Sequence, residues 1–261
     1  MEPAGASAAV VVIGNEILSG RTRDANLSHL ARKLGEVGIA VAEARIVPDD
    51  GDAIVEAVNA LRARYAYVFT TGGIGPTHDD ITAAAVARAF GVPFERNAEA
   101  ERRLLAYYDP DQVNAARLSM ADMPAGVELI DNPVSVAPGF RLANVYVLPG
   151  VPKILEAMVE LLTPRLAGGA PIVSRALTVF CAEGALAQTL AAVEAEAEGV
   201  ALGSYPFVRQ GRFGTTVVVR GRDEARVVAA LATLRTRVEA LGFAHAAFDA
   251  AATATGVPRA E

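Results

Sequence analysis

The sequence predicts an α/β protein with a mainly parallel sheet sandwiched by helices, followed by a small α+β domain. Apolar, β-branched runs alternate with helical patterns through residues 8–168, which is typical of βαβ units. The run Ala9 to Gly14 is continuously apolar, as in a strand buried on both faces. Residues 172–245 follow a β-α-β-β-α order, and residues 246–261 resemble a loose tail. These observations predict two domains.

Each expected strand of the first domain leads into a turn and then a helix. The strands are expected at Ala9 to Gly14, Ile39 to Val47, Tyr67 to Thr71, and Arg141 to Gly150. Helices are expected at about 22–37, 52–62 and 79–90, and from Pro152 onward. Residues 97–123 have a helical pattern interrupted at Tyr107 to Gln112, and Asp131 to Phe140 form a loop rich in Pro and Gly.

A Gly- and Pro-rich stretch, Leu166 to Pro171, marks the expected boundary between the domains. Beyond it, the sequence predicts a strand at 174–180, a helix at 183–198 and a hairpin formed by 200–208 and 214–221. A closing helix is expected at 223–241.

Composition narrows the functional classes. The net charge of −6 argues against a nucleic-acid-binding surface as the main role. The single cysteine, Cys181, cannot form an internal disulfide. No apolar run approaches the length of a membrane span, and the N-terminus lacks the basic region of a signal peptide. We therefore expect a cytoplasmic protein that contacts neither membrane nor nucleic acid.

Four polar turns follow strands that should end on one edge of the sheet. They are Gly14 to Gly20, Pro48 to Asp50, Thr70 to Asp80, and Leu148 to Pro152. Ligands of doubly wound sheets bind outside the carboxyl ends of the strands. The four turns together therefore predict a ligand-binding rim.

The turn from Thr70 to Asp80 combines an expected anion site with two carboxylates. Its glycines, Gly72, Gly73 and Gly75, permit positive φ and close backbone approach, so consecutive amides can form an anion nest beside a helix start. It matches neither the P-loop nor the G-x-G-x-x-G fingerprint. Asp79 and Asp80 are either a helix cap with a first-turn charge, contributing about 0.5–2 kcal/mol, or members of a metal-binding carboxylate cluster.

In the cluster interpretation, Asp79 and Asp80 join Glu16, Asp49 and Asp50 to hold Mg²⁺ against a phosphate, because hard oxygen ligands suit that ion. A divalent cation would let carboxylates and phosphate share one helix terminus.

Several other polar residues have two interpretations. His78 either contacts phosphate, acts as an acid or base, or has a positional role in its loop. Asn15 and Asn26 either bind substrate or serve as turn or cap residues. Ser19 shows no sign of triad activation, which disfavours a serine nucleophile.

The segments GNEILSG, TTGGIGPTHDD, NPVSVAPGF and LPGVP resemble the molybdopterin-binding (MoaB/Mog-like) domain of the competence/damage-inducible protein A (CinA) family. The resemblance covers residues 8–166. These residues are also similar to the N-terminal domain of eukaryotic FAD synthase. The small second domain also resembles the α+β segment that follows this module in CinA-like proteins.

The resemblance implies binding of a phosphorylated pterin or a nucleotide pyrophosphate, with a divalent metal (Mg²⁺, Mn²⁺ or Co²⁺) or molybdopterin as ligand. It implies functional roles for Asp80 and Asp49, and together with the carboxylate cluster it makes Asp80, Asp79 and Asp49 the expected catalytic and metal-binding residues. The residues that it assigns to substrate binding are Gly14, Asn15, Glu16, Asn26, Thr71, Gly72, Gly73, Gly75, Pro76, Thr77, Asn132, Pro133, Pro138, Gly139, Pro149 and Gly150.

The chain departs from its relatives in three ways. It ends before the C-terminal amidohydrolase domain of full-length CinA could fit, and it lacks the catalytic domain of FAD synthase. Ser135 and Val136 stand where CinA commonly has Gly-Thr, so one polar substrate contact is lost.

The residues and the resemblance together indicate three candidate functions. The first is metal-dependent hydrolysis of a nucleotide pyrophosphate resembling ADP-ribose or FAD. The alternatives are a pterin- or nucleotide-binding module without turnover, and molybdopterin adenylyl transfer. The second domain suggests a homo-oligomer, because related domains commonly self-associate.

Overall fold

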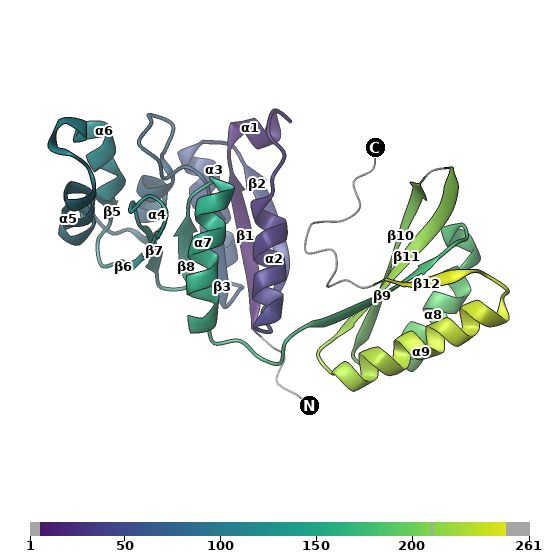
Figure 1. Ribbon diagram of the computed structural model, residues 1–261. Helices are drawn as coiled ribbons and strands as arrows, with labels where there is room; N and C mark the ends of the chain where they lie inside the picture. Colours follow the sequence, from purple (N-terminus) through teal and green to yellow (C-terminus); the bar gives the residue numbers. More distant parts are fainter. Residues whose placement is uncertain (1–5, 210, 249–261) are drawn as a thin grey trace. The chain divides into compact units, whose positions relative to one another are not determined.

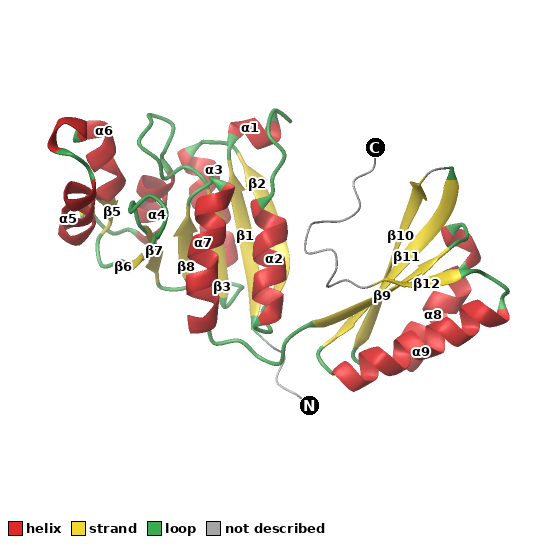
Figure 2. Ribbon diagram, in the orientation of Figure 1, coloured by secondary structure: helices red, strands yellow, loops and turns green. Residues whose placement is uncertain are grey.

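The computed structural model describes residues 6–209 and 211–248. The chain divides into two compact units, Met1–Gly169 and Ala170–Glu261. Each unit has its own sheet (Figures 1 and 2). Each unit also has its own hydrophobic core.

The sheet of the first unit has six strands in the order β2-β1-β3-β8-β7-β6. Strands β2, β1, β3 and β8 are parallel, whereas β7 runs antiparallel to both β8 and β6. The expected mainly parallel α/β fold is thereby confirmed. The strands are β1 Ser7–Ile13, β2 Ala40–Val47, β3 Tyr67–Thr71, β6 Glu128–Ile130, β7 Gly139–Leu142 and β8 Val145–Leu148.

Helices cover both faces of this sheet (Figure 2). The side chains of β1 alternate between the two faces. Ala9, Val11 and Ile13 pack with α3 and α4, while Val10 and Val12 pack with α2 and α7. The helices are α1 Asn15–Leu18, α2 Asn26–Glu36, α3 Gly51–Arg62, α4 Thr82–Phe90, α5 Ala98–Tyr107, α6 Ala115–Leu118 and α7 Pro152–Leu162.

The segment between α4 and β6 combines α5 and α6 with two short 3₁₀ helices, η1 Pro110–Gln112 and η2 Ser119–Ala121. Strands β4 Phe94–Arg96 and β5 Asp122–Pro124 pair antiparallel on either side of it. A third 3₁₀ helix, η3 Thr163–Arg165, follows α7. The expected interruption of the helical pattern is present at η1, but β4 and β5 were not predicted because strands of three residues carry no periodic signal.

The second unit is a four-stranded antiparallel sheet in the order β10-β11-β9-β12. Helices α8 and α9 pack on one face through Val193, Val227 and Leu234. The elements are β9 Val173–Val179, η4 Glu183–Ala185, α8 Ala187–Glu196, β10 Val200–Arg209, β11 Arg212–Gly221, α9 Glu224–Ala240 and β12 His245–Phe248.

Some predicted boundaries were wrong. The strand expected at Arg141 to Gly150 is two strands, because Ala143 takes a positive φ of 51° and the chain reverses there. The helix expected at 183–198 is split between η4 and α8. Residues 246–248 belong to β12, whereas the rest of the expected tail, 249–261, lies outside the described residues.

No helix in the described part of the chain combines the length and the apolar character that crossing a membrane requires.

Candidate functional site at the carboxyl ends of the strands

The four polar turns do follow parallel strands of one sheet, as predicted. Strand β1 lies between β2 and β3, so the chain order reverses beside β1. Such a switch point leaves a crevice between the loops that leave the two neighbouring strands. The turn after β1 is tied to β2 by the Gly14 amide, which donates to the Val47 carbonyl at 3.1 Å.

The glycine loop after β3 adopts the predicted positive φ at two positions. Gly72 has φ 102° and Gly73 has φ 69°. A Cβ on Gly73 would lie 2.2 Å from Thr82 Oγ1, so the position also requires close approach. Buried Thr82 holds this part of the loop, since its Oγ1 donates to the Gly72 carbonyl and its amide donates to the Gly73 carbonyl, both at 2.9 Å.

The Asp80 carboxylate occupies the centre of the same loop. It accepts hydrogen bonds from the Gly75 amide at 2.6 Å, the Thr77 amide at 2.8 Å and the Thr77 hydroxyl at 2.5 Å. A Cβ on Gly75 would lie 2.7 Å from Asp80 Oδ2, which explains the glycine at that position. The Gly72 amide is also engaged, because it donates to the Leu148 carbonyl at 3.1 Å.

The expected anion nest is therefore corrected. The amides of Gly72 and Gly75 already have protein partners, and the anion held by the loop is Asp80 itself. Among the described residues, the amides of Gly73 and Ile74 make no hydrogen bond, and these remain available to a ligand. A carboxylate at this turn is thus not in conflict with its electrostatics.

The helix-cap interpretation of Asp79 and Asp80 is wrong. Helix α4 begins at Thr82, its N-cap is Ile81, and no side chain caps it. Because Asp80 folds back to Gly75 and Thr77, the chain reaches helical geometry later than the sequence pattern indicates.

Asp79 lies beside Asp80 and is exposed. Its Oδ1 lies 2.5 Å from the Thr77 hydroxyl, which contacts Asp80 as well. A hydroxyl has one hydrogen to donate, so the two carboxylates share one donor. The Thr77 hydrogen bond lowers the pKa of Asp79, with further lowering from its own backbone amide and the neighbouring His78. The rim therefore carries a pair of adjacent carboxylates.

The turns after β1 and β2 are joined by a third aspartate. Asp49 Oδ2 accepts a hydrogen bond from the Asn15 amide at 2.8 Å. Asp50, by contrast, is the N-cap of α3 and accepts from the amides of Asp52 and Ala53. The Glu16 carboxylate lies against Gly14, where a Cβ would be 2.5 Å from its oxygens. Asp50 is therefore a helix-capping residue rather than a ligand.

The carboxylates do not form the expected cluster. Within residues 6–209 and 211–248, no three His, Cys, Asp or Glu side chains are grouped so that they could hold a metal ion. The ligand set Asp49, Asp79 and Asp80 is therefore not assembled. Mg²⁺ is commonly held by one or two carboxylates together with substrate phosphates and waters. The Asp79–Asp80 pair fits a metal of that kind, which would bind together with a ligand.

Asn26 is part of the rim but does not present its side chain to solvent. It is the first residue of α2, only 5 % of it is exposed, and its Nδ2 donates to the Gly150 carbonyl at 2.8 Å. The helix starts here rather than near residue 22 because Asp24 accepts from the amides of Asn26 and Leu27. The expected direct contact of Asn26 with substrate is therefore corrected: Asn26 joins the start of α2 to the β8–α7 turn.

The loop from Asp131 to Gly139 uses its polar groups internally. Asn132 donates to Ser135 Oγ and the Ala137 carbonyl, and it accepts from the amides of Val134 and Ser135. These four bonds exhaust the capacity of an asparagine side chain, so Asn132 has none left for a ligand. Val136 has φ 63°, a strained conformation for a β-branched residue.

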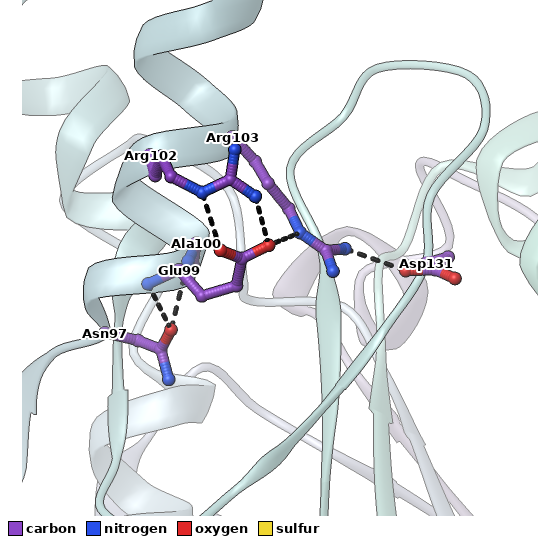
Figure 3. Close-up of polar contacts among 6 residues, drawn as sticks. All are labelled: Asn97, Glu99, Ala100, Arg102, Arg103 and Asp131. Atoms are coloured by element: carbon purple, nitrogen blue, oxygen red, sulfur yellow. Dashed lines mark hydrogen bonds and ion pairs between the residues drawn. The ribbon is translucent and has the colours of Figure 1, made fainter.

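This loop is also anchored from outside. Arg103 of α5 bridges Glu99 Oε1 at 2.8 Å and Asp131 Oδ1 at 2.7 Å (Figure 3). Glu99 binds Arg102 too, and the two arginines lower the pKa of Glu99 to about 2. Asn97 starts the helix by accepting from the amides of Glu99 and Ala100. Helix α5 thus holds the beginning of the loop.

The remaining residues expected to bind substrate differ in how exposed they are. Pro76, Thr77, Pro133 and Gly150 are exposed, as is Asn15, while Glu16 and Pro149 are half-buried. The side chains at Thr71 and Pro138 are buried, as are Gly14 and Gly139, so these four support the loops rather than touch a ligand.

Two residues of the rim were missed by the sequence analysis. Thr82 was overlooked, although a hydroxyl residue just after a glycine-rich turn is a recognisable signal for loop hydrogen bonding. Lys153, the second residue of α7, is exposed and has no ion pair among the described residues. It directly follows LPGVP, and it is one of only two lysines in the chain.

The first unit is an α/β fold of the doubly wound kind, and its candidate site lies on the loops at the carboxyl ends of the strands. Residues 9–168 match the family described as a probable molybdopterin-binding domain, and the chain belongs to that family. Residues 171–246 match the middle domain of FAD synthase.

Individual relatives agree with this assignment. A CinA-like protein of Citrifermentans bemidjiense is 41 % identical over 61 % of this chain and 40 % of its own length. A CinA-like protein of Syntrophus aciditrophicus is 35 % identical over 84 % of this chain and 55 % of its own length. The chain thus spans about half the length of these relatives.

A solved structure has the same fold as the first unit. It is the protein CinA of unknown function from Thermoplasma acidophilum, 33 % identical, with a TM-score of 0.58. The match covers 61 % of this chain and 96 % of that one.

Proposed function

We propose that the rim of the first unit binds a nucleotide pyrophosphate resembling ADP-ribose or FAD and hydrolyses it with a divalent metal ion. The observation that carries this proposal is the carboxylate pair Asp79–Asp80 on one Thr77 hydroxyl, at the carboxyl end of β3. Membership of the molybdopterin-binding family supports the ligand class.

The rim residues have different roles in this proposal. Asp80 holds the glycine loop in shape through Gly75 and Thr77, while Asp79 is exposed and shares the Thr77 hydroxyl. The amides of Gly73 and Ile74 and the ammonium group of Lys153 would receive the phosphate charge. A divalent metal held by Asp79 and Asp80 would polarise the phosphoryl group and activate a water.

The test is a substrate panel of ADP-ribose, FAD and a phosphorylated pterin, each assayed with Mg²⁺, Mn²⁺, Co²⁺ or EDTA. Product release is followed by chromatography. We expect release from at least one nucleotide pyrophosphate that requires metal and that Asp79→Asn abolishes or strongly reduces. Equal, metal-independent release by wild type and variant would reject the proposal.

A second candidate is a binding module without turnover. It is favoured by the absence of a three-ligand metal group in the described part of the chain and by the fully occupied Asn132. Calorimetry that shows binding of a panel member, together with no product release under any metal, would select this function.

We also propose that the chain forms a homo-oligomer through the second unit. Near the turn of the β10–β11 hairpin, the cross-strand pair Val208 and Phe213 is 63 % and 68 % exposed, and large exposed apolar side chains mark association surfaces. Light scattering should show a species larger than 27.1 kDa that Phe213→Ser converts to a monomer. A monomeric wild type at micromolar concentration would contradict this proposal.

A further inference from the structure

Asn26 makes a long-range contact that joins two of the rim turns. Its Nδ2 donates to the carbonyl of Gly150, 124 positions away in the sequence, at 2.8 Å. The bond links the first residue of α2 to the β8–α7 turn. Since the side chain is almost fully buried, its role is exerted through Gly150 and not by contact with a ligand.

The same side chain is poorly satisfied where it lies. Asn26 Oδ1 is buried and has no hydrogen-bond partner among the described residues. A buried acceptor without a partner destabilises the fold, whereas a leucine of similar size would bury apolar surface at the same place. A buried asparagine whose acceptor is unmatched therefore points to a role other than stability.

The Gly150 contact reaches the glycine loop. A Cβ on Gly150 would lie 3.2 Å from the Gly72 Cα, so these two glycines are packed backbone against backbone. The Gly72 amide donates to the Leu148 carbonyl, and its own carbonyl accepts from Thr82 Oγ1. A continuous set of contacts thus runs from Asn26 through Gly150 and Gly72 to the start of α4.

We propose that Asn26 is a positioning residue, which holds the β8–α7 turn against Gly72 and thereby sets the spacing between the turn that carries Lys153 and the loop that carries Asp79. The effect on ligand binding rests on the proposed function, whereas the effect on the turn does not. A purely structural residue would instead change stability and leave the turn's conformation unaltered in the folded protein.

The test compares Asn26→Leu, and Asn26→Asp as a second variant of equal size, with Asn144→Leu. Asn144 is a matched control because its Nδ2, like that of Asn26, donates to backbone carbonyls far away in the sequence, here those of Arg62 and Tyr65. Asn144 itself lies in the β7–β8 turn, away from the rim. Each protein is measured by thermal unfolding, by hydrogen exchange of residues 149–155, and by calorimetry with ADP-ribose and Mn²⁺.

For Asn26→Leu we expect an unchanged or higher Tm, at least fivefold faster exchange in residues 149–155, and at least tenfold weaker ADP-ribose binding. Asn26→Asp should give the same loss of protection, because an acceptor then faces the Gly150 carbonyl. Asn144→Leu should lower Tm without changing exchange in that segment.

Unchanged exchange in residues 149–155 in a folded Asn26 variant would overturn the proposal, whatever the ligand result. Faster exchange with unchanged ADP-ribose affinity would overturn its ligand-positioning part. If wild type itself does not bind any member of the substrate panel, the proposed function fails, and the exchange measurement still decides the role of Asn26 in the turn.

Discussion

At the scale of single residues, Asp80 explains why carboxylates occur at a turn that favours anions. Its oxygens satisfy the Gly75 and Thr77 amides, which would otherwise attract a ligand anion. Asp79 then lies next to it, exposed, and shares the Thr77 hydroxyl. The two adjacent residues therefore differ in role: both belong to the proposed metal-binding pair, but only Asp80 also organises the loop.

The first prediction concerns Asp80→Ala. The variant leaves two amides and a hydroxyl without their shared acceptor, so we expect the free energy of unfolding to fall by about 1–2 kcal/mol. Urea unfolding measures this change. Asp111→Ala, at an exposed position of η1, is the control and should change stability by less than about 0.5 kcal/mol. Equal effects of the two substitutions would show that the loop does not depend on Asp80.

A second prediction follows from the lowered pKa of Asp79, whose main cause is the Thr77 hydroxyl. Because the folded pKa lies below the unfolded one, the contact contributes to stability above about pH 4 and is lost as the pH falls through the folded pKa. In Thr77→Val the pKa of Asp79 should rise toward its ordinary value. Carboxyl NMR titration measures it, and identical midpoints in both proteins would contradict the assignment.

The sequence predicted local properties of the site better than its tertiary contacts. Positive φ at Gly72 and Gly73 is a backbone requirement of the turn, so the glycines alone indicated it. The hydrogen bonds of Asp80 and Asn132 lie within single loops and depend on the exact backbone path of each loop, whereas the Asn26–Gly150 contact joins residues 124 positions apart. No local pattern separates these from exposed ligand contacts.

At the scale of elements, long periodic segments were predicted better than short strands. Long periodic segments such as α3 and α9 were predicted to within two residues. Strands β4, β5, β6 and β12 were not, because segments of three or four residues have no measurable period and are fixed by their neighbours.

The third prediction concerns the anchoring of the Asp131 loop by α5 (Figure 3). Arg103 contacts both Glu99 and Asp131, whereas Arg102 contacts Glu99 alone. We expect Arg103→Gln to accelerate hydrogen exchange of residues 131–137 severalfold and Arg102→Gln to leave it unchanged. Equal exchange in the two variants would show that the Asp131 ion pair does not restrain the loop.

At the scale of the whole molecule, the rim and the four-stranded sheet belong to different units. All the rim residues lie between Gly14 and Lys153, and the cores of the first unit contain no residue of the second.

The fourth prediction is that residues 1–169 fold by themselves and retain ligand binding. Circular dichroism should show a cooperative thermal transition, and calorimetry should give the affinity of the full chain for the ligand found in the substrate panel. A fragment that folds but loses affinity would show that the second unit contributes to the site.

The most direct test of the central claim is the metal-dependent rate of pyrophosphate hydrolysis by wild type and Asp79→Asn, with ADP-ribose and Mn²⁺. Asparagine keeps an oxygen that can accept from Thr77, so the loop is preserved while one negative charge is removed. We predict turnover by wild type that falls roughly 10–100-fold in the variant. Equal rates in the two proteins would contradict the role given to this carboxylate pair.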